Sequence, residues 1–447
     1  MTNNTTAKLA KDLYKINEFT NKDKEQIVIL ITDFFAAMCA GYRLNSEFNE
    51  KLRTIIASDG NEQSSYVFGQ KEKLSCDKAA FLNSVYGHGA ELDDGNKKAA
   101  GHAGVHIIPS VFALADKLNS SNKDVLRAIA TGYEAYIRIS SSVQPGIVER
   151  GFHSTGMAGT LACAAACARL YHLDSNGIEN AIALATTLSG GLLSYGDSRP
   201  AIKPLNPGKA AANGIFAASL ASVGVQGPEA ALEGPHGWFH AVSDHVNLRM
   251  LQGKDHLLLH ECYMKLYPSC RHTHCGIDAG IYLHGKVSIA EINRIEVFIY
   301  PKAIELAGLE MPVDKDETKF SIKYTLACAL KDGKYGMDSM DPPKLTADII
   351  NIMEKISLIP DPMLEKKEEG IRGTTVVVHL KNGDNVQAMV LIPRGDPENP
   401  LTRDEVINKL KTCATYCDRD GAVLTVREDI ERILTKGTFV NPIRRVS

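Results

Sequence analysis

The sequence has almost no net charge. Its 50 lysines and arginines nearly balance 53 aspartates and glutamates, which leaves a formal net charge of −3. Such a chain lacks the broad basic field that draws in nucleic acid or an anionic membrane. We therefore expect neither a nucleic-acid partner nor a membrane partner. An anionic ligand would have to be held by a few local cations.

Long hydrophobic runs are also missing. The first residues, MTNNTTAKLAKDLYKINEF, lack the apolar core of a signal peptide, and later runs such as ATTLSGGLLSYG are short. We expect a soluble, cytoplasmic protein without a membrane-spanning segment. Hydrophobic residues make up 44% of the 447 positions and charged residues 23%, an ordinary globular balance that suffices for two domains.

The ten cysteines lack any regular metal-binding spacing. Cys163/Cys167 and Cys413/Cys417 are each four residues apart in helical sequence, and neither pair has a His or Cys partner at zinc-finger spacing. We expect reduced, mostly buried thiols and no structural metal site.

Helical patterns dominate up to about residue 266. A polar start at 20–25 precedes the apolar run IVILITDFFAAMCA, and Ser121 with Asp124 begins another helix. The segments 156–173, 176–192 and 208–224 consist largely of small residues. Because small residues let helix backbones approach closely, we expect these segments at the centre of a helical bundle.

Strand patterns appear after residue 290. Apolar and polar residues alternate in 292–300, 373–380 and 385–392. Asn382-Gly383 between the last two predicts a hairpin with a type I′ turn, which requires positive φ at both central residues. Helices are expected near 319–331 and 345–356.

The order of these patterns predicts a mainly α chain with two domains. Residues 393–397, PRGDP, indicate a linker, and Thr402 with Glu405 predicts a capping box that starts a final helical segment. We predict a large all-helical domain, 1–267 completed by 403–447, and a smaller α/β lid domain, 268–402, inserted into it.

Polar residues cluster first between positions 88 and 106. This stretch holds acidic and imidazole side chains separated by glycines: His88, Glu91, Asp93, Asp94, His102 and His106. Such groups suit acid/base catalysis or metal ligation. The competing interpretation is helix capping by the two aspartates, with histidines on the surface. The sequence leaves both open.

Two further clusters flank helices of small residues. His153 lies in GFHSTG, directly before one such helix, where the helix dipole disfavours its charged form. It could act as a base there, or it could equally be a loop histidine without a role. Lys203 lies in a proline-rich connector, residues 199–209, ahead of a helix expected to start near Gly208. A lysine beside a helix N-terminus is a plausible carboxylate site, although most loop lysines are merely solvated.

The fourth cluster, KLYPSCRHTHC at 265–275, lies where the helical pattern gives way to the lid pattern. Clefts between domains are common small-molecule sites. Arg271 suits bidentate carboxylate binding, and Cys270 or His274 could transfer a proton. The Cys/His alternation lacks a metal-binding frame.

Five segments in this order resemble the MmgE/PrpD family, which includes 2-methylcitrate dehydratases, cis-aconitate decarboxylases and iminodisuccinate epimerases. They are ELDDG…GHAG…IIPS (91–110), GFHSTGMAGTLACAAACARLYHLD (151–174), KPLNPGKAAANGIFAASLASVGVQGP (203–228), KLYPSCRHTH (265–274) and FSIKYTLACAL (320–330). The resemblance implies a helical domain, an α/β lid, a homodimer, a cleft site and no metal or organic cofactor.

Carried over by position, the resemblance places the family's polar residues on Asp93, Asp94, His102, His153, Lys203, Lys265 and Tyr324. Together with the clusters, this predicts two sets of site residues. The catalytic candidates are His153, His102, Asp93, Cys270 and Tyr324. The substrate-binding candidates are Lys203, Lys265, Arg271, Asp94 and His274.

Three positions depart from the decarboxylase pattern. Cis-aconitate decarboxylases resemble DxDDT where this chain has ELDDG, so that Glu91 and Gly95 replace an Asp and a Thr, and Cys270 replaces a His. The lost hydroxyl and imidazole argue against that decarboxylase.

The leading hypothesis is a cofactor-free lyase, a dehydratase, that abstracts a proton beside a carboxylate of a small di- or tricarboxylic acid. An epimerase of an imino- or hydroxy-dicarboxylate is the alternative. A cis-aconitate-type decarboxylase, a metallohydrolase using the 88–106 cluster and a non-catalytic helical scaffold are less favoured.

Overall fold

The computed structural model describes residues 4–57, 63–194, 202–366 and 370–446. They form two compact units, one of Met1–Tyr263 with Arg403–Ser447 and the other of Met264–Thr402. Helices predominate in the described chain, which confirms the mainly α prediction.

The first unit is built from helices. They are α1 (Thr5–Tyr14), α2 (Asn21–Leu44), α3 (Ser46–Ala57), α4 (Cys76–His88), α5 (Gly104–Leu118), α6 (Asn122–Ser142), α7 (Gly146–Glu149), α8 (Ser154–Leu170), α9 (Ser175–Thr186), α11 (Leu205–Ser222), α12 (Trp238–Val242), α19 (Arg403–Tyr416) and α20 (Val423–Arg432). Two short strands, β1 (Gly95–Asn96) and β2 (Cys262–Tyr263), pair antiparallel.

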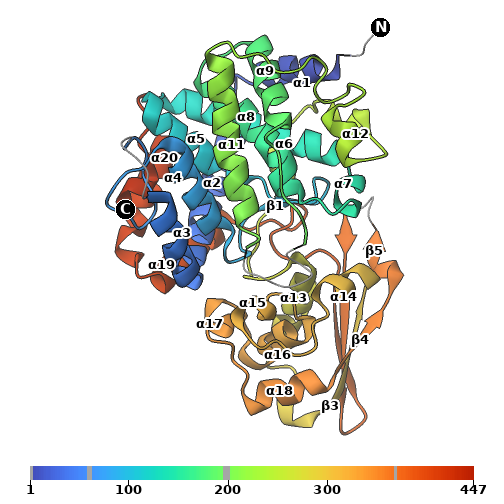
Figure 1. Ribbon diagram of the computed structural model, residues 1–447. Coiled ribbons are helices and arrows are strands. Elements are labelled where there is room, and N and C mark those ends of the chain that lie inside the picture. Colours follow the sequence, from blue (N-terminus) through green and yellow to red (C-terminus); the bar gives the residue numbers. More distant parts are fainter. Residues whose placement is uncertain (1–3, 58–62, 195–201, 367–369, 447) are drawn as a thin grey trace. The chain divides into compact units, whose positions relative to one another are not determined.

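Helix α8 lies at the centre of the first unit, between α6 and α11 (Figure 1). Every residue of α8 is buried. Small residues allow this packing, because a Cβ on Gly214 of α11 would lie 2.2 Å from the Cβ of Cys163 on α8. The predicted central position of the Ala-rich helix is confirmed. Helix α11 starts at Leu205 rather than near Gly208, since Pro207 falls in the first turn, where its missing N–H costs no helical bond.

The predicted helix starts at 20–25 and at Ser121 are confirmed. Thr20 accepts a hydrogen bond from the Asp23 N–H while Asp23 accepts one from the Thr20 N–H, and Ser121 caps α6 through the Asp124 N–H. At the other end of the chain, α19 packs against α2.

Helix α2 corrects one expectation about hydrophobic runs. Its 24 residues include a window with a mean hydropathy of 1.7, long and apolar enough to cross a membrane by length and composition. The residues of that window are 83% buried inside the protein. A helix surrounded by others is apolar on all sides, so a core helix passes the same test.

The second unit combines helices with a four-stranded sheet. Its elements are α13 (His274–Leu283), β3 (Ile292–Ile299), α14 (Pro301–Ala307), α15 (Lys315–Thr318), α16 (Ile322–Asp332), α17 (Met337–Met340), α18 (Ala347–Glu354), β4 (Ile356–Pro360), β5 (Glu365–Lys366), β6 (Ile371–Arg372), β7 (Thr374–Leu380) and β8 (Asn385–Val390). The strand order is β4-β3-β7-β8, with β3 and β4 parallel and the other pairs antiparallel. Alternate residues of β3 and β7, among them Ile295, Val297, Val376 and Val378, are buried in its core with α13 and α16.

The predicted hairpin of β7 and β8 is confirmed, but its turn is of another type. Gly383 donates its N–H to Leu380 O at 3.0 Å, so Lys381 and Asn382 are the central turn residues and the glycine follows them. Gly383 has a φ of 93°, whereas Asn382 is not in the positive-φ region. This is the pattern of a type I turn followed by a left-handed residue, which also joins antiparallel strands.

All ten cysteines are free thiols, and nine are buried, as predicted.

Candidate active site

The loop from Gly89 to Ala103, between α4 and α5, carries the first polar cluster in the interior of the first unit. His88, His102 and His106 are 1%, 8% and 0% exposed, so the interpretation as surface histidines is wrong. The loop is anchored at several points. Lys409 of α19 donates to Leu92 O at 2.7 Å, and β1 pairs with β2. These contacts satisfy buried polar groups of the loop and hold it in place.

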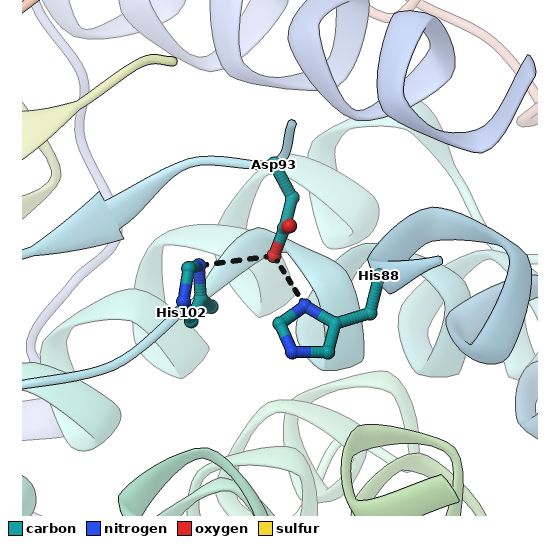
Figure 2. Close-up of side chains that lie close together, drawn as sticks. All are labelled: His88, Asp93 and His102. Carbon is teal, nitrogen blue, oxygen red and sulfur yellow. Dashed lines mark hydrogen bonds and ion pairs between the residues drawn. The ribbon is translucent and has the colours of Figure 1, made fainter. Parts of the chain in front are cut away.

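Asp93 binds two imidazoles with one carboxylate oxygen. Its Oδ2 lies 2.9 Å from His88 Nδ1 and 3.1 Å from His102 Nδ1 (Figure 2). Burial would raise the pKa of Asp93, but the two imidazoles outweigh burial and hold its pKa well below the usual value. Asp93 is therefore ionised at neutral pH. Burial lowers the pKa of His88, and the negative charge of Asp93 offsets this lowering only in part.

The hydrogen bonds decide which ring nitrogen carries the proton. His102 Nδ1 also lies 2.7 Å from the main-chain oxygen of Asp94. A carbonyl oxygen only accepts, so Nδ1 of His102 must carry a hydrogen, and in the neutral ring the lone pair lies on Nε2. His88 Nδ1 likewise donates, because its partner is an ionised carboxylate.

The same three side chains, His88, Asp93 and His102, offer ligand atoms within 4.8 Å of one another, a spacing that could hold a metal ion. Metal ligation by histidine requires a lone pair on the ligating nitrogen. Nδ1 of His102, which faces the Asp94 carbonyl, carries a hydrogen instead. We therefore interpret the cluster as hydrogen-bonded acid/base groups.

The carboxylate of Asp94 contacts α5 and α6. Its Oδ1 accepts from the Gly104 N–H at 2.9 Å, and its Oδ2 accepts from the Tyr133 hydroxyl at 2.8 Å. The predicted capping role thus holds for Asp94, which satisfies the first N–H of α5. Burial and the charge of Asp33 raise the pKa of Asp94 to about 7.

His153 is the N-cap residue of α8, as the sequence suggested. The side-chain nitrogen of Asn206 lies 3.1 Å from His153 Nδ1 and 3.3 Å from Leu192 O. Because the carbonyl accepts, this nitrogen is an N–H donor, and His153 Nδ1 accepts from it. The proton of neutral His153 then lies on Nε2. Its ring is 6.1 Å from that of His88, centroid to centroid.

The surroundings of His153 shift its pKa in the direction that its place before a helix suggested. Burial, the positive charge of Lys203 and the nearby His88 hold its pKa well below 6.5. His153 is therefore neutral at physiological pH and presents an N–H group. A neutral imidazole at a helix N-terminus can polarise a substrate oxygen by donating a hydrogen bond.

Lys203 forms an ion pair with Glu91. The lysine side chain is 17% exposed and the glutamate side chain 8%, so the pair is mostly shielded from solvent. Residues 199–201 of the same predicted cluster lie outside the described residues. The ion pair shows that Lys203 is not a freely solvated loop lysine.

Tyr263 explains one departure from the decarboxylase pattern. A Cβ on Gly95 would lie 2.4 Å from the hydroxyl oxygen of Tyr263. Any larger residue, threonine included, would collide with this ring while it keeps its position. The tyrosine hydroxyl thus occupies the space that a side chain at position 95 would take.

The remaining candidates lie in the second unit. Lys265 is buried there, and Arg271 forms an ion pair with Asp396. Cys270 is half-buried and donates its N–H to Lys319 O at 2.9 Å. Burial lowers the pKa of the neighbouring His272 to about 3, and the positive charges of Arg372, Arg271 and Lys265 contribute to this shift.

Two other candidates in this unit are engaged with their surroundings. His274, the first residue of α13, is fully buried with its ring 5.2 Å from that of Tyr267. The Tyr324 hydroxyl donates to Ser339 O and accepts from the Lys344 N–H at 2.7 Å. Burial raises the pKa of Tyr324. The catalytic roles of these residues stay predictions.

Asn206, Tyr133 and Lys409 were not predicted from the sequence, yet each contacts the site from a different helix. Asn206 lies in KPLNPG, a segment already singled out, so its amide could have been considered. Tyr133 and Lys409 give no local signal, because their partners Asp94 and Leu92 are 39 and 317 residues away.

Comparison with known proteins identifies the family. Residues 7–251 match the MmgE/PrpD N-terminal domain, and residues 267–431 match the MmgE/PrpD C-terminal domain. The chain belongs to the MmgE/PrpD family. This confirms the resemblance and supports an enzyme of the lyase class.

Curated relatives of this MmgE/PrpD chain include cis-aconitate decarboxylases. The human one is 30% identical over 79% of this chain and 76% of its own length. That of Aspergillus terreus is 24% identical over 94% of this chain and 90% of its own. A cis-aconitate decarboxylase-like protein of Aspergillus oryzae is 26% identical over 80% of each chain.

Proposed function

We propose that this protein is a cofactor-independent lyase that removes a proton beside a carboxylate of a small polycarboxylic acid. The observation that supports it is the complementary protonation of two histidines in the first unit. His102 has its lone pair on Nε2, backed by ionised Asp93, and His153 has its proton on Nε2. One imidazole suits proton abstraction, and the other suits hydrogen-bond donation.

The reaction we favour is dehydration of a hydroxy acid. His102 Nε2 takes the proton from the carbon beside the carboxylate, and the electron pair moves toward that carboxylate. The His153 Nε2–H and the Lys203 ammonium stabilise the negative charge that develops on its oxygens. The hydroxyl on the neighbouring carbon then leaves with the proton from His102, so that water is released, a double bond forms and His102 is neutral again.

Decarboxylation is the second candidate, favoured by the cis-aconitate decarboxylases among the relatives. In that reaction a carbon–carbon bond breaks, carbon dioxide leaves and the electron pair stays on carbon. His102 would have to begin protonated and deliver its proton to that carbon. Gly95 and Cys270, which depart from the decarboxylase pattern, are the reason dehydration ranks first.

One assay separates these reactions. The purified protein is incubated in deuterium oxide with citrate-like hydroxy acids, with cis-aconitate and with hydroxy-dicarboxylates, and followed by proton NMR. Dehydration produces an alkene at the expense of a hydroxy acid. Decarboxylation releases carbon dioxide and places deuterium on the product carbon, whereas epimerisation exchanges the α-proton without an alkene. If the protein turns over none of these acids, the proposal is wrong.

Thermal denaturation with the same acids selects the substrate class beforehand. A ligand present at 100 times its dissociation constant stabilises the folded protein by about 2.7 kcal/mol.

A further inference from the structure

His88 is the member of the Asp93 cluster that the proposed reaction does not use. It is the last residue of α4, and its side chain is completely buried, whereas that of His102 is 10% exposed. Its Nε2 finds no hydrogen-bond partner among the described residues. A fully buried imidazole is poorly placed to meet a substrate, so its contact with Asp93 is the feature that needs an explanation.

Asp93 has little else to hold it. Its Oδ2 accepts from His88 Nδ1 at 2.9 Å and lies 3.1 Å from His102 Nδ1, whose single hydrogen also faces Asp94 O at 2.7 Å. Its Oδ1 has no hydrogen-bond partner among the described residues. The orientation of this buried, ionised carboxylate therefore depends mainly on the Nδ1–H of His88 (Figure 2). Loss of this donor leaves the charge with a shared hydrogen alone, a costly arrangement in an interior of low dielectric.

We propose that His88 is a positioning residue: its Nδ1–H holds the Asp93 carboxylate beside Nδ1 of His102, where the negative charge favours uptake of a proton at Nε2. When His102 takes up a proton at Nε2, the imidazolium is stabilised by Asp93, and no proton passes to the carboxylate or to His88. The inference deepens the proposed function, on which it rests, because it assumes that His102 transfers the proton.

A matched pair of substitutions separates the two ring nitrogens of His88. In His88→Asn the amide N–H lies near the place of Nδ1 and nothing replaces Nε2. In His88→Leu the volume is similar but no donor remains. We expect His88→Leu to lower kcat at least ten-fold with little change in KM, and His88→Asn to recover most of that loss.

The decisive readout needs no substrate. Long-range ¹H–¹⁵N correlation spectra of protein labelled in its histidines report which ring nitrogen carries hydrogen, and His102→Gln assigns the signals. Because Asp94 O also holds the hydrogen on Nδ1 of His102, we expect the same tautomer in all three proteins. The Nδ1–H resonance of His102 should keep its wild-type position in His88→Asn and shift in His88→Leu, because the Asp93 carboxylate no longer lies in the same place. If leucine at 88 prevents folding, His88→Gln replaces it, since its amide extends toward the Nε2 position and leaves the Nδ1 donor unreplaced.

Two results overturn the proposal. One is an unchanged His102 Nδ1–H resonance when the Nδ1 donor of His88 is lost. The other is a His88→Asn enzyme as slow as His88→Leu, which would make Nε2 of His88 the atom that matters. A protein that turns over none of the acids would instead defeat the proposed function, while the spectra would still decide the role of His88.

Discussion

Lys409 and Asp33 form a buried ion pair across 376 residues of sequence. Lys409 Nζ lies 2.6 Å from Asp33 Oδ1, and the two side chains are 3% and 0% exposed. The same ammonium group donates to Leu92 O, the carbonyl directly before Asp93. The pair thus connects α2, α19 and the loop of the candidate site.

Replacing Lys409 with methionine should destabilise the fold strongly. The substitution leaves Asp33 charged and buried without its cation, a change that typically costs about 3–5 kcal/mol. Urea unfolding of Lys409→Met measures the loss. Lys411→Met, at an exposed position of the same helix, is the matched control and should lie within about 0.5 kcal/mol of the wild type. Equal stabilities of the two variants would show that the buried pair contributes nothing.

Asp94→Asn should change how stability depends on pH. The pKa of Asp94, about 7, lies above its unfolded value near 3.9, so the folded state binds more protons between about pH 4 and 7. The stability that this group contributes is complete below pH 4 and is lost as the pH rises to about 7.

Asparagine resembles the protonated carboxyl group of Asp94 at every pH in this range. We therefore expect the wild type to lose stability relative to Asp94→Asn as the pH rises from 4 to 7, and the difference to level off above pH 8. Denaturant unfolding of both proteins across this range measures the difference, in which other carboxylates cancel. A constant difference would mean that Asp94 titrates normally in the fold.

His102→Gln should reduce turnover more than His153→Gln does. A glutamine at 102 removes the proton acceptor, and positioned acid/base catalysis contributes about 10²–10⁴-fold. A glutamine at 153 can still donate an N–H near the place of Nε2, so we expect a loss of about ten- to a hundred-fold. Steady-state kinetics on the substrate found by NMR give both values. The reverse order would make His153 the principal base.

Lys203→Ala should weaken binding of the acid by about 1.5–3 kcal/mol, the scale of a charged hydrogen bond. Glu91→Gln should strengthen it by about 1 kcal/mol, because the lysine no longer shares its charge with a competing carboxylate. Lys265→Ala is expected to behave like Lys203→Ala. Calorimetric titration measures the binding free energy of the acid for each variant, with Lys209→Ala, at an exposed position, as the control. Wild-type affinity in Lys203→Ala would remove this residue from the binding site.

Gly95→Ala should destabilise the first unit by about 1–3 kcal/mol, the usual cost of overpacking. The added Cβ meets the Tyr263 hydroxyl, so truncating the tyrosine should make room for it. In a double-mutant cycle, Gly95→Ala should cost less in Tyr263→Ala than in the wild type. Additive effects would indicate that the tyrosine moves aside freely.

Local chemistry determined much of the secondary structure. The capping box of Thr20 and Asp23, the small residues of α8 and the alternation in β3 act over one or two turns or pleats, and each predicts its element correctly. The type of the turn before β8 was predicted wrongly, because the register of a hairpin depends on strand pairing as well as on Asn-Gly.

The candidate site divides in the same way. Residue type and spacing singled out Asp93, His102 and His153 from the sequence, because chemistry at neutral pH needs such groups. Which ring nitrogen carries a proton, and whether an imidazole is charged, depended on Asp94 O, on Asn206 and on burial. Tertiary structure alone decided this, because a proton's position is set by the atoms that packing brings within hydrogen-bond distance.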